Sequence, residues 1–290
     1  MTTADLSQVV VKLMAQGLKK SPGALYYDSS RFAPEKVPAA WGGALNTQPW
    51  FAPVNPFILD SNVMNFLITT NGEAQDVVVL PELPGGFLEV VSKIKRAQVS
   101  GPMVHVSQSW RNNQARFTFM GRAPETQGSY PFSVAVEQPV EYYFHRLREA
   151  LHRHGIQGEL PLLEAAGRNL TRTILYTHQS QPLRELISWV NKESDNLAAE
   201  AVVRAASMKN KTRPLNRSKG LEVLREVIAN DFPRFANQVH LADGAGLDRQ
   251  TRMSASFLVH LLNRVRTRND FRAEYIRSLS LGGWDGTLRY

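Results

Sequence analysis

The chain has 290 residues, no cysteine and a formal net charge of +8. Its length and its 43% hydrophobic residues predict one large domain or two to three small ones with a substantial core. The composition excludes disulfides, cysteine-ligated zinc and a thiol nucleophile, and it indicates neither disorder nor a transmembrane segment.

A helix followed by a strand is predicted at the start of the chain. Thr2 or Thr3 can cap the helix, its apolar residues recur at helical spacing, and Gly17 lies where a C-terminal cap belongs. Residues 24–27 are expected to form the strand. The first five residues lack the basic and apolar runs of a signal peptide, so none is expected in this chain.

Strands are predicted for most of the next hundred residues. Frequent prolines and short apolar runs at 63–68 and 77–80 favour a β-rich segment between Phe32 and about Pro84. Alternating residues predict further strands near 104–106, 115–119 and 132–136. Pro139 then begins a helix that ends at Gly155, and 171–176 is expected to form another strand.

Helices are expected to predominate after Pro182. Apolar stripes at 183–190 and 197–205 predict two of them, and a polar linker at 209–219 leads into a third over 221–228. A short strand at 239–241 and a helix over 257–265 follow. The chain therefore combines helices and strands, with the helices concentrated in its last third.

The histidines and the basic charge offer little support for specialised binding. His152 and His154 would point about 200° apart on a helix, so a solvated helix end is favoured over a metal site. We expect no metal and no cofactor. A basic surface spread over several helices is favoured over a nucleic-acid site, because the basic run at 209–213 has no interleaved aromatic residue.

The segment 191–197 joins two apolar helical stripes with polar residues. By itself Ser194-Asp195-Asn196 is typical of a helix start, since Ser, Asp and Asn are favoured N-cap residues. Together with its flanks, the stretch 191–200 resembles the second active-site motif of the D-alanyl-D-alanine carboxypeptidase/endopeptidase family. These proteins are low-molecular-mass penicillin-binding proteins with inserted domains.

Three further stretches support this resemblance, in the family's order. Residues 241–249 are similar to D-G-S-G-L-S-R with Ala245 in place of a serine, and 282–288 resemble A-G-x-D-G-T-L. Residues 23–32 resemble G-x-L-x-x-D-x-S-x-F. The resemblance covers nearly the whole chain and is far more specific than the S-D-N tripeptide.

Two motifs of the family are expected to be missing from these 290 residues. The nucleophilic serine of its S-x-x-K motif lies upstream of the helix that opens this chain, and its K-T-G strand lies downstream of D-G-T-L. The segments 188–191, 211–213 and 218–220 do not replace them. The chain resembles the middle of a longer protein or a truncated gene, and alone it is expected to be inactive and not acylated by labelled penicillin.

The resemblance implies roles for several residues. Ser194 would relay a proton toward the leaving amine, and Asn196 would hold the amide of the substrate. Lys192 and Asp195 would tune the local charge. Asp243 would either brace the site or start an Asp-Gly turn, and the turn is favoured.

The implied fold is α/β (α+β): a partial serine β-lactamase/transpeptidase-like domain with inserted α/β and β-rich domains. The penicillin-binding (D,D-peptidase) domain would span 171–290. The inserted α/β domain would span 1–32 and 90–170, and the β-rich domain 33–90. Without the K-T-G strand, we expect an exposed sheet edge and marginal stability or aggregation.

The implied function is that of a serine-type D-Ala-D-Ala carboxypeptidase or endopeptidase acting on peptidoglycan stem peptides. The expected partners are peptidoglycan peptides, with β-lactams in the full-length family, and the expected location is the periplasm or cell envelope. One alternative is a non-catalytic relic that binds cell-wall peptides or a partner. The other is a basic nucleic-acid-binding protein. Carboxypeptidase versus endopeptidase preference and oligomeric state stay open.

Overall fold

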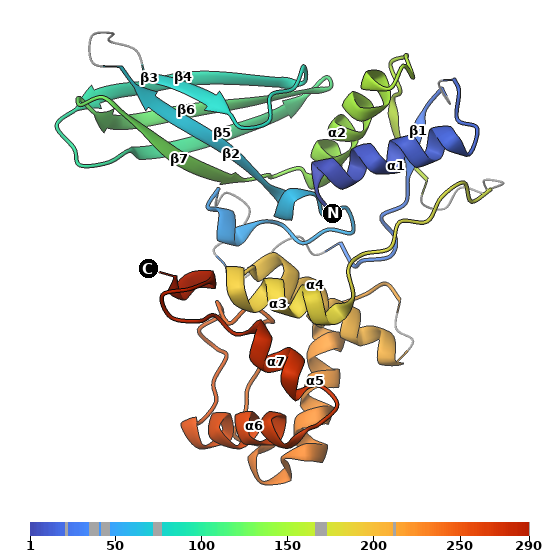
Figure 1. The fold of residues 1–290 in the computed structure, drawn as a ribbon, viewed down its shortest axis with the longest axis vertical. Helices are drawn as coiled ribbons and strands as arrows, with labels where there is room; N and C mark the ends of the chain where they lie inside the picture. The colour runs from blue at the N-terminus through green and yellow to red at the C-terminus, as the bar shows by residue number, and fades with distance from the viewer. Residues whose placement is uncertain are drawn as a thin grey trace. The chain divides into compact units, whose positions relative to one another are not determined.

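The computed structural model describes residues 1–20, 23–34, 41, 47–71, 77–165, 173–210 and 213–289. The chain divides into two compact units (Figure 1). Unit 1 comprises Met1–Ser29 and Ala44–His178, and unit 2 comprises Ser30–Gly43 and Gln179–Tyr290. None of the helices in the described ranges is both long and apolar enough to cross a lipid bilayer.

The first helix of unit 1, α1 (Thr3–Ala15), begins where its sequence predicts. The Thr2 hydroxyl accepts a hydrogen bond from the Asp5 amide at 3.1 Å, and the Asp5 carboxylate accepts one from the Thr2 amide at 2.8 Å. This reciprocal capping box satisfies two amides that would otherwise lack acceptors. Gly17 follows the helix with a φ of 101°, which suits glycine.

Two three-stranded sheets form most of unit 1. One has the order β3–β2–β7 and is antiparallel throughout, with strands β2 (Val63–Thr70), β3 (Val77–Pro81) and β7 (Gly128–Ala135). The other has the order β4–β6–β5, with strands β4 (Leu88–Ala97), β5 (Met103–Arg111) and β6 (Gln114–Pro124). In it β4 is parallel to β6, and β5 and β6 form an antiparallel hairpin.

Aromatic side chains make the core between these sheets. The ring of Phe66 on β2 lies 5.5 Å from that of Phe117 and 4.8 Å from that of Phe119, both on β6. The helix α2 (Pro139–Arg153) adds the buried Tyr142 to the same cluster. A third, small sheet pairs β1 (Leu25–Tyr27) with β8 (Leu162–Glu164) in parallel. The mixed α/β class that the sequence predicts is therefore confirmed.

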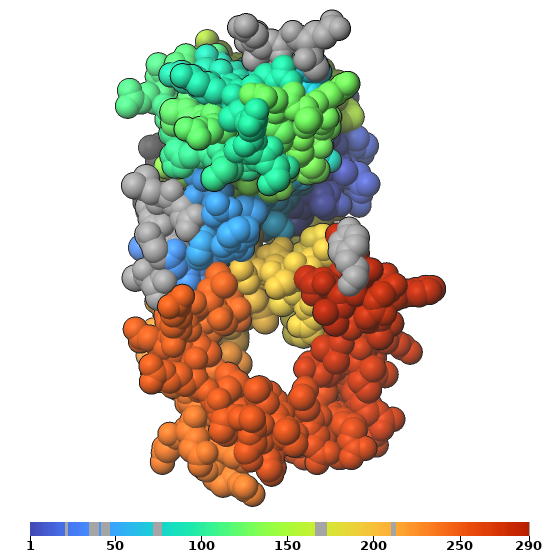
Figure 2. Space-filling model, turned by 90° about the vertical axis from the view of Figure 1, so that its left-hand side faces the viewer, coloured from blue at the N-terminus to red at the C-terminus, as the bar shows by residue number. Residues whose placement is uncertain are grey.

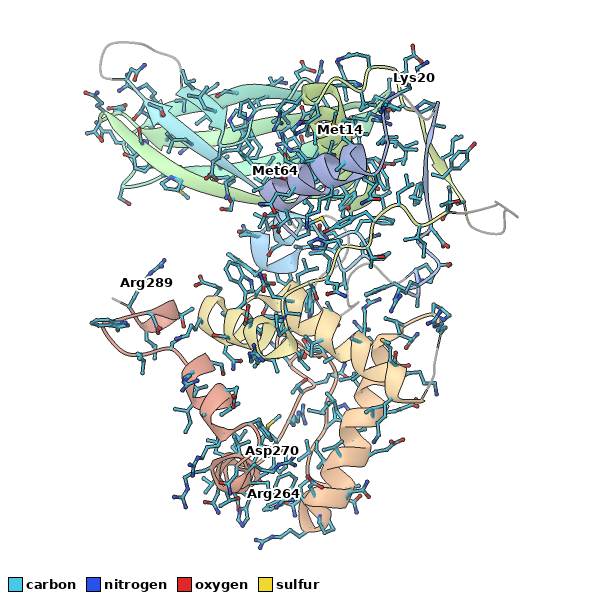
Figure 3. The ribbon with its side chains drawn as sticks, turned by 45° about the vertical axis from the view of Figure 1, so that its right-hand side comes forward. Met14, Lys20, Met64, Arg264, Asp270 and Arg289 are labelled. Carbon is cyan, nitrogen blue, oxygen red and sulfur yellow. The ribbon has the colours of Figure 1, made fainter. Side chains whose placement is uncertain are left out.

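Unit 2 is helical in its described part. Its helices are α3 (Leu183–Glu193), α4 (Asn196–Ala206), α5 (Arg217–Asp231), α6 (Ala255–Thr267) and α7 (Arg272–Ser278). Helices α4 and α5 pack closely because Gly220 has no side chain, and a Cβ there would collide with the Val203 carbonyl oxygen. Arg264 and Asp270 mark the end of α6 and the turn after it (Figure 3).

Several local predictions were wrong. The expected strand at 171–176 lies partly outside the described residues, and its described part, 173–176, has no regular structure. The expected strand at 239–241 is a single bridge between His240 and Arg252. Helix α7 was not predicted. The described residues of unit 2 form no named strand, so the sheet edge expected there is not found among them.

Unit 2 also presents large apolar side chains to solvent. Exposed fractions are 54% for Trp189 on α3, 49% for Leu262 on α6, 54% for Ile276 on α7 and 82% for Trp284. Figure 2 shows an opening in unit 2 between its orange and red segments, which hold α5 and the helices after it.

Candidate functional site

Ser194 lies in a tight turn between α3 and α4. It has a left-handed backbone conformation, with φ 55° and ψ 43°, which is uncommon for a residue other than glycine. Its side chain is exposed, and its hydroxyl makes no hydrogen bond to any residue in the described ranges. A free hydroxyl on a strained turn is available to a bound molecule.

Asp195, and not Ser194, caps the helix that follows. One oxygen of its carboxylate accepts a hydrogen bond from the Ala198 amide at 2.9 Å. The other accepts one from Trp189 Nε1 at 3.0 Å. Asn196 is the first residue of α4 and is half-buried. The N-cap that the tripeptide predicts is therefore Asp195. Ser194 precedes it in the turn, and Asn196 follows it as the first residue of α4.

Lys192 connects this turn to the stretch 282–288. Its ammonium group pairs with the Asp285 carboxylate and donates a hydrogen bond to the Leu279 carbonyl at 3.1 Å. The hydrogen bond from Lys192 lowers the pKa of Asp285, so this carboxyl stays ionised. Gly286 has a φ of 60°, and a Cβ there would lie 2.9 Å from the Lys192 carbonyl oxygen. Two of the stretches that carry the resemblance thus lie in contact.

Asp243 organises the stretch 241–249. The side chain is buried, and its carboxylate accepts hydrogen bonds from three successive backbone amides, those of Gly246, Leu247 and Asp248, at 2.8 to 3.0 Å. It also accepts one from Trp41 Nε1 at 3.0 Å and one from the Thr251 hydroxyl at 3.2 Å. Asp243 therefore holds a loop in shape, and no hydrogen bond joins it to Ser194.

Glu200 joins the loop to helix α4 and is a residue that sequence reasoning missed. Its carboxylate is fully buried and accepts a hydrogen bond from the Gly244 amide. Burial raises the pKa of Glu200. A Cβ on Gly244 would lie 2.5 Å from a methyl group of Val203, so the loop can approach α4 only with glycine here. No local pattern in the sequence marks Glu200, because its role depends on the fold that brings Gly244 against α4.

The fourth stretch, 23–32, has two different environments. Residues 25–27 form β1 in unit 1. Phe32 belongs to unit 2, where it bridges Leu215 and lies under the guanidinium group of Arg204, 5.9 Å from the ring centre. The first half of this stretch thus supports a sheet, and the second half packs against the helices that carry the site.

One segment of the chain has the spacing of an S-x-x-K motif by coincidence. Ser92-Lys93-Ile94-Lys95 lies on β4 in unit 1. Residues three apart on a strand point to opposite faces, so Lys95 cannot take a proton from Ser92. Both side chains are exposed. This segment matches the pattern by spacing alone and does not supply a nucleophile.

Metal binding finds no support among the described residues. They contain no group of three His, Asp or Glu side chains that could hold a metal ion. His152 Nε2 instead lies 2.8 Å from the Gly158 carbonyl oxygen at the end of α2. The side chains at the Ser194 turn offer hydroxyl, amide, carboxylate and ammonium groups.

Proteins similar to this chain include DacB of Haemophilus influenzae. The chain is 24% identical over 294 residues to D-alanyl-D-alanine carboxypeptidase DacB of Haemophilus influenzae, covering 99% of this chain and 60% of that protein. The crystal structure of penicillin-binding protein 4 (dacB) from the same organism matches with a TM-score of 0.81 at 22% identity, over all of this chain and 63% of that one. Its complex with a novel β-lactam matches with a TM-score of 0.74.

The fold is therefore that of penicillin-binding protein 4, and the chain spans about 60% of the length of the relatives it matches. The model of one peptidase family, D-Ala-D-Ala carboxypeptidase 3 (S13), matches residues 1–290. The match therefore includes all four of the motif-like stretches. The chain belongs to the D-Ala-D-Ala carboxypeptidase 3 (S13) family.

Proposed function

We propose that this chain forms part of a serine-type D-Ala-D-Ala carboxypeptidase or endopeptidase that acts on peptidoglycan stem peptides in the cell envelope. The observation that carries the proposal is the Ser194 turn, with its exposed hydroxyl free of hydrogen bonds to the described residues and Asn196 beside it. Family membership over the whole chain supports it. The complex of the similar structure with a β-lactam supports a role in β-lactam binding.

In the proposed reaction, the nucleophilic serine of the family attacks the carbonyl carbon before a terminal D-alanine. The carbon–nitrogen bond breaks, D-alanine leaves with a proton, and water then hydrolyses the acyl-enzyme. Ser194 passes the proton to the leaving amine, because its hydroxyl can accept one proton and donate another. Asn196 holds the amide of the substrate. Proton transfer by a positioned group contributes about 10²- to 10⁴-fold to such rates.

Three further residues support the turn in this proposal. The ammonium group of Lys192 fixes the end of α3 against Asp285 and adds positive charge near Ser194. Asp195 holds the turn through Ala198 and Trp189. Asp243 positions the neighbouring loop, which Glu200 ties to α4. These contacts keep Ser194 and Asn196 in one geometry.

The test is the activity of the gene product that contains these 290 residues, with whatever sequence the genome encodes on either side. D-alanine release from a pentapeptide measures carboxypeptidase activity, and cleavage of cross-linked muropeptide dimers measures endopeptidase activity. We expect Ser194→Ala to lower kcat/KM by about a hundredfold or more, with Ser180→Ala as the matched control on an exposed serine. Equal activity of both variants would overturn the assignment. Peptide binding without any turnover in the wild-type protein would favour a non-catalytic role.

A further inference from the structure

Unit 1 contains a cavity of about 390 Å³ that is separate from the Ser194 turn. Three parts of unit 1 line it: one face of α2, the end of the β5–β6 hairpin, and the β1–β8 sheet. In Figure 1 that end of the hairpin lies beside α2. Its volume falls in the range of small-molecule sites. The lining includes the charged residues Arg111, Glu141, Arg148 and Glu164 and the aromatic residues Tyr27 and Trp110.

Helix α2 contributes Glu141, His145 and Arg148 to this cavity, and their spacing places them on one face. Arg148 is only 8% exposed. Its Nε donates to the Leu160 carbonyl at 2.7 Å, and its Nη1 lies 3.3 Å from His145 Nδ1. Its Nη2 is buried and makes no hydrogen bond to any described residue. A buried donor without an acceptor costs about 1 to 3 kcal/mol, so an incoming acceptor would be favoured.

The surroundings keep the guanidinium group of Arg148 in place. Burial, together with the charges of Arg148 and Arg146, lowers the pKa of His145 to about 4, so the ring is neutral at pH 7 and its Nδ1 can accept from Arg148. The His145 ring stacks on Phe87, with 4.6 Å between centroids and 6° between planes. Arg148 is therefore a fixed cation that a neutral imidazole and a carbonyl hold in position.

The end of the β5–β6 hairpin supplies another wall of the cavity. Asn112 and Asn113 both have positive φ, 51° and 59°, as the type I′ turn of a two-residue β-hairpin requires. The turn brings the exposed Arg111 to the cavity as a second cation. Trp110 Nε1 donates to Gln108 at 3.1 Å, which fixes the indole. Glu164 on β8 also lines the cavity, and its carboxylate accepts a hydrogen bond from the Ser29 hydroxyl at 2.7 Å.

We propose that this cavity binds a short peptide in its zwitterionic form. Arg148 and Arg111 would take the carboxylate, Glu141 and Glu164 would take the ammonium group, and Trp110 and Tyr27 would cover the backbone between them. The cavity lining carries two arginines and two glutamates, so it matches a ligand that bears both charges. The volume suits several residues and exceeds what a single ion needs. The site lies within unit 1 and does not depend on the proposed peptidase activity.

Calorimetric titration with triglycine tests the proposal, using the gene product that contains these residues. Triglycine amide lacks the carboxylate and N-acetyl-triglycine lacks the ammonium group, so each removes one half of the recognition. We expect saturable binding of triglycine, about tenfold weaker binding of the acetylated peptide, and loss of binding for the amide. No saturable binding of triglycine, or equal binding of all three peptides, would overturn the proposal.

Variants locate the site. Arg148→Gln and Arg111→Gln should each weaken triglycine binding about tenfold or more, because each removes a charged hydrogen-bond donor. The matched control is Arg116→Gln, an exposed arginine on β6 that pairs with Glu89 and does not line the cavity. Arg148 is buried and its variant can fail to fold, in which case Arg111→Gln and Glu141→Gln decide. Binding that survives both of these would overturn the proposal. D-alanine release by the Arg111→Gln protein should stay unchanged, which separates this site from the peptidase assignment.

Discussion

Replacing Asp243 with asparagine removes the negative charge that five hydrogen-bond donors share. Oδ2 accepts from Trp41 Nε1 and from the Leu247 and Asp248 amides. Oδ1 accepts from the Gly246 amide and the Thr251 hydroxyl. Wherever the asparagine places its NH₂ group, at least one backbone amide loses its acceptor. An orphaned buried amide costs about 1 to 3 kcal/mol, and the remaining bonds weaken because their acceptor is no longer charged.

We therefore expect Asp243→Asn to destabilise unit 2 by roughly 3 kcal/mol. Asp248→Asn is the matched control on the same loop. The Asp248 side chain accepts a hydrogen bond from the Gln250 amide at 2.8 Å, and its replacement should cost less than about 1 kcal/mol. Urea denaturation measures the difference, and hydrogen exchange of the amides at 246–248 measures it locally. Equal stability of the two variants, with unchanged exchange at these amides, would refute the view that Asp243 holds the loop.

Two further predictions concern backbone strain and pH. Gly286→Ala should destabilise unit 2 by about 1 to 3 kcal/mol, because the backbone has a φ of 60° and the new Cβ would collide with Ser280 Oγ. Gly282→Ala should be close to neutral, since nothing lies within 4 Å of the new Cβ, and urea denaturation of both variants checks the contrast. The stability of unit 1 should fall as pH falls from about 6.5 to about 4. Between these two pH values His145 binds a proton in the unfolded chain. In the folded state His145 stays neutral, because its pKa is about 4 there. The loss should reach up to about 3 kcal/mol, and His145→Gln should flatten this pH dependence in urea denaturation.

Local signals in the sequence predicted much of the fold. The cap formed by Thr2 and Asp5, the proline that begins α2 and the alternating residues of β2 and β6 each act over a few residues, so a pattern can detect them. The wrong predictions concern segments whose secondary structure depends on tertiary contacts. Residues 239–241 have strand-like composition, yet they find a partner only at His240 and so form a single bridge. The three-part division of the chain into domains stays a prediction.

The candidate site depends on contacts that no local pattern reveals. Lys192 and Asp285 are 93 residues apart in sequence, and only the folded chain shows that they pair. Glu200 is similarly visible as a site component only through its bond to Gly244. The resemblance placed the four stretches in one family, and the family match confirms this membership. The roles of Ser194, Asn196, Lys192, Asp195 and Asp243 stay predictions.

The measurement that tests the central claim most directly is the rate of acylation by a fluorescent penicillin. The gene product that contains these 290 residues would be compared with its Asn196→Ala and Ser194→Ala variants, after thermal unfolding has shown that all three fold alike. The account predicts labelling of the wild-type protein and a rate about a hundredfold lower in the Ser194→Ala protein. Labelling of both variants at the wild-type rate would contradict the claim that the turn between α3 and α4 forms part of a penicillin-sensitive active site.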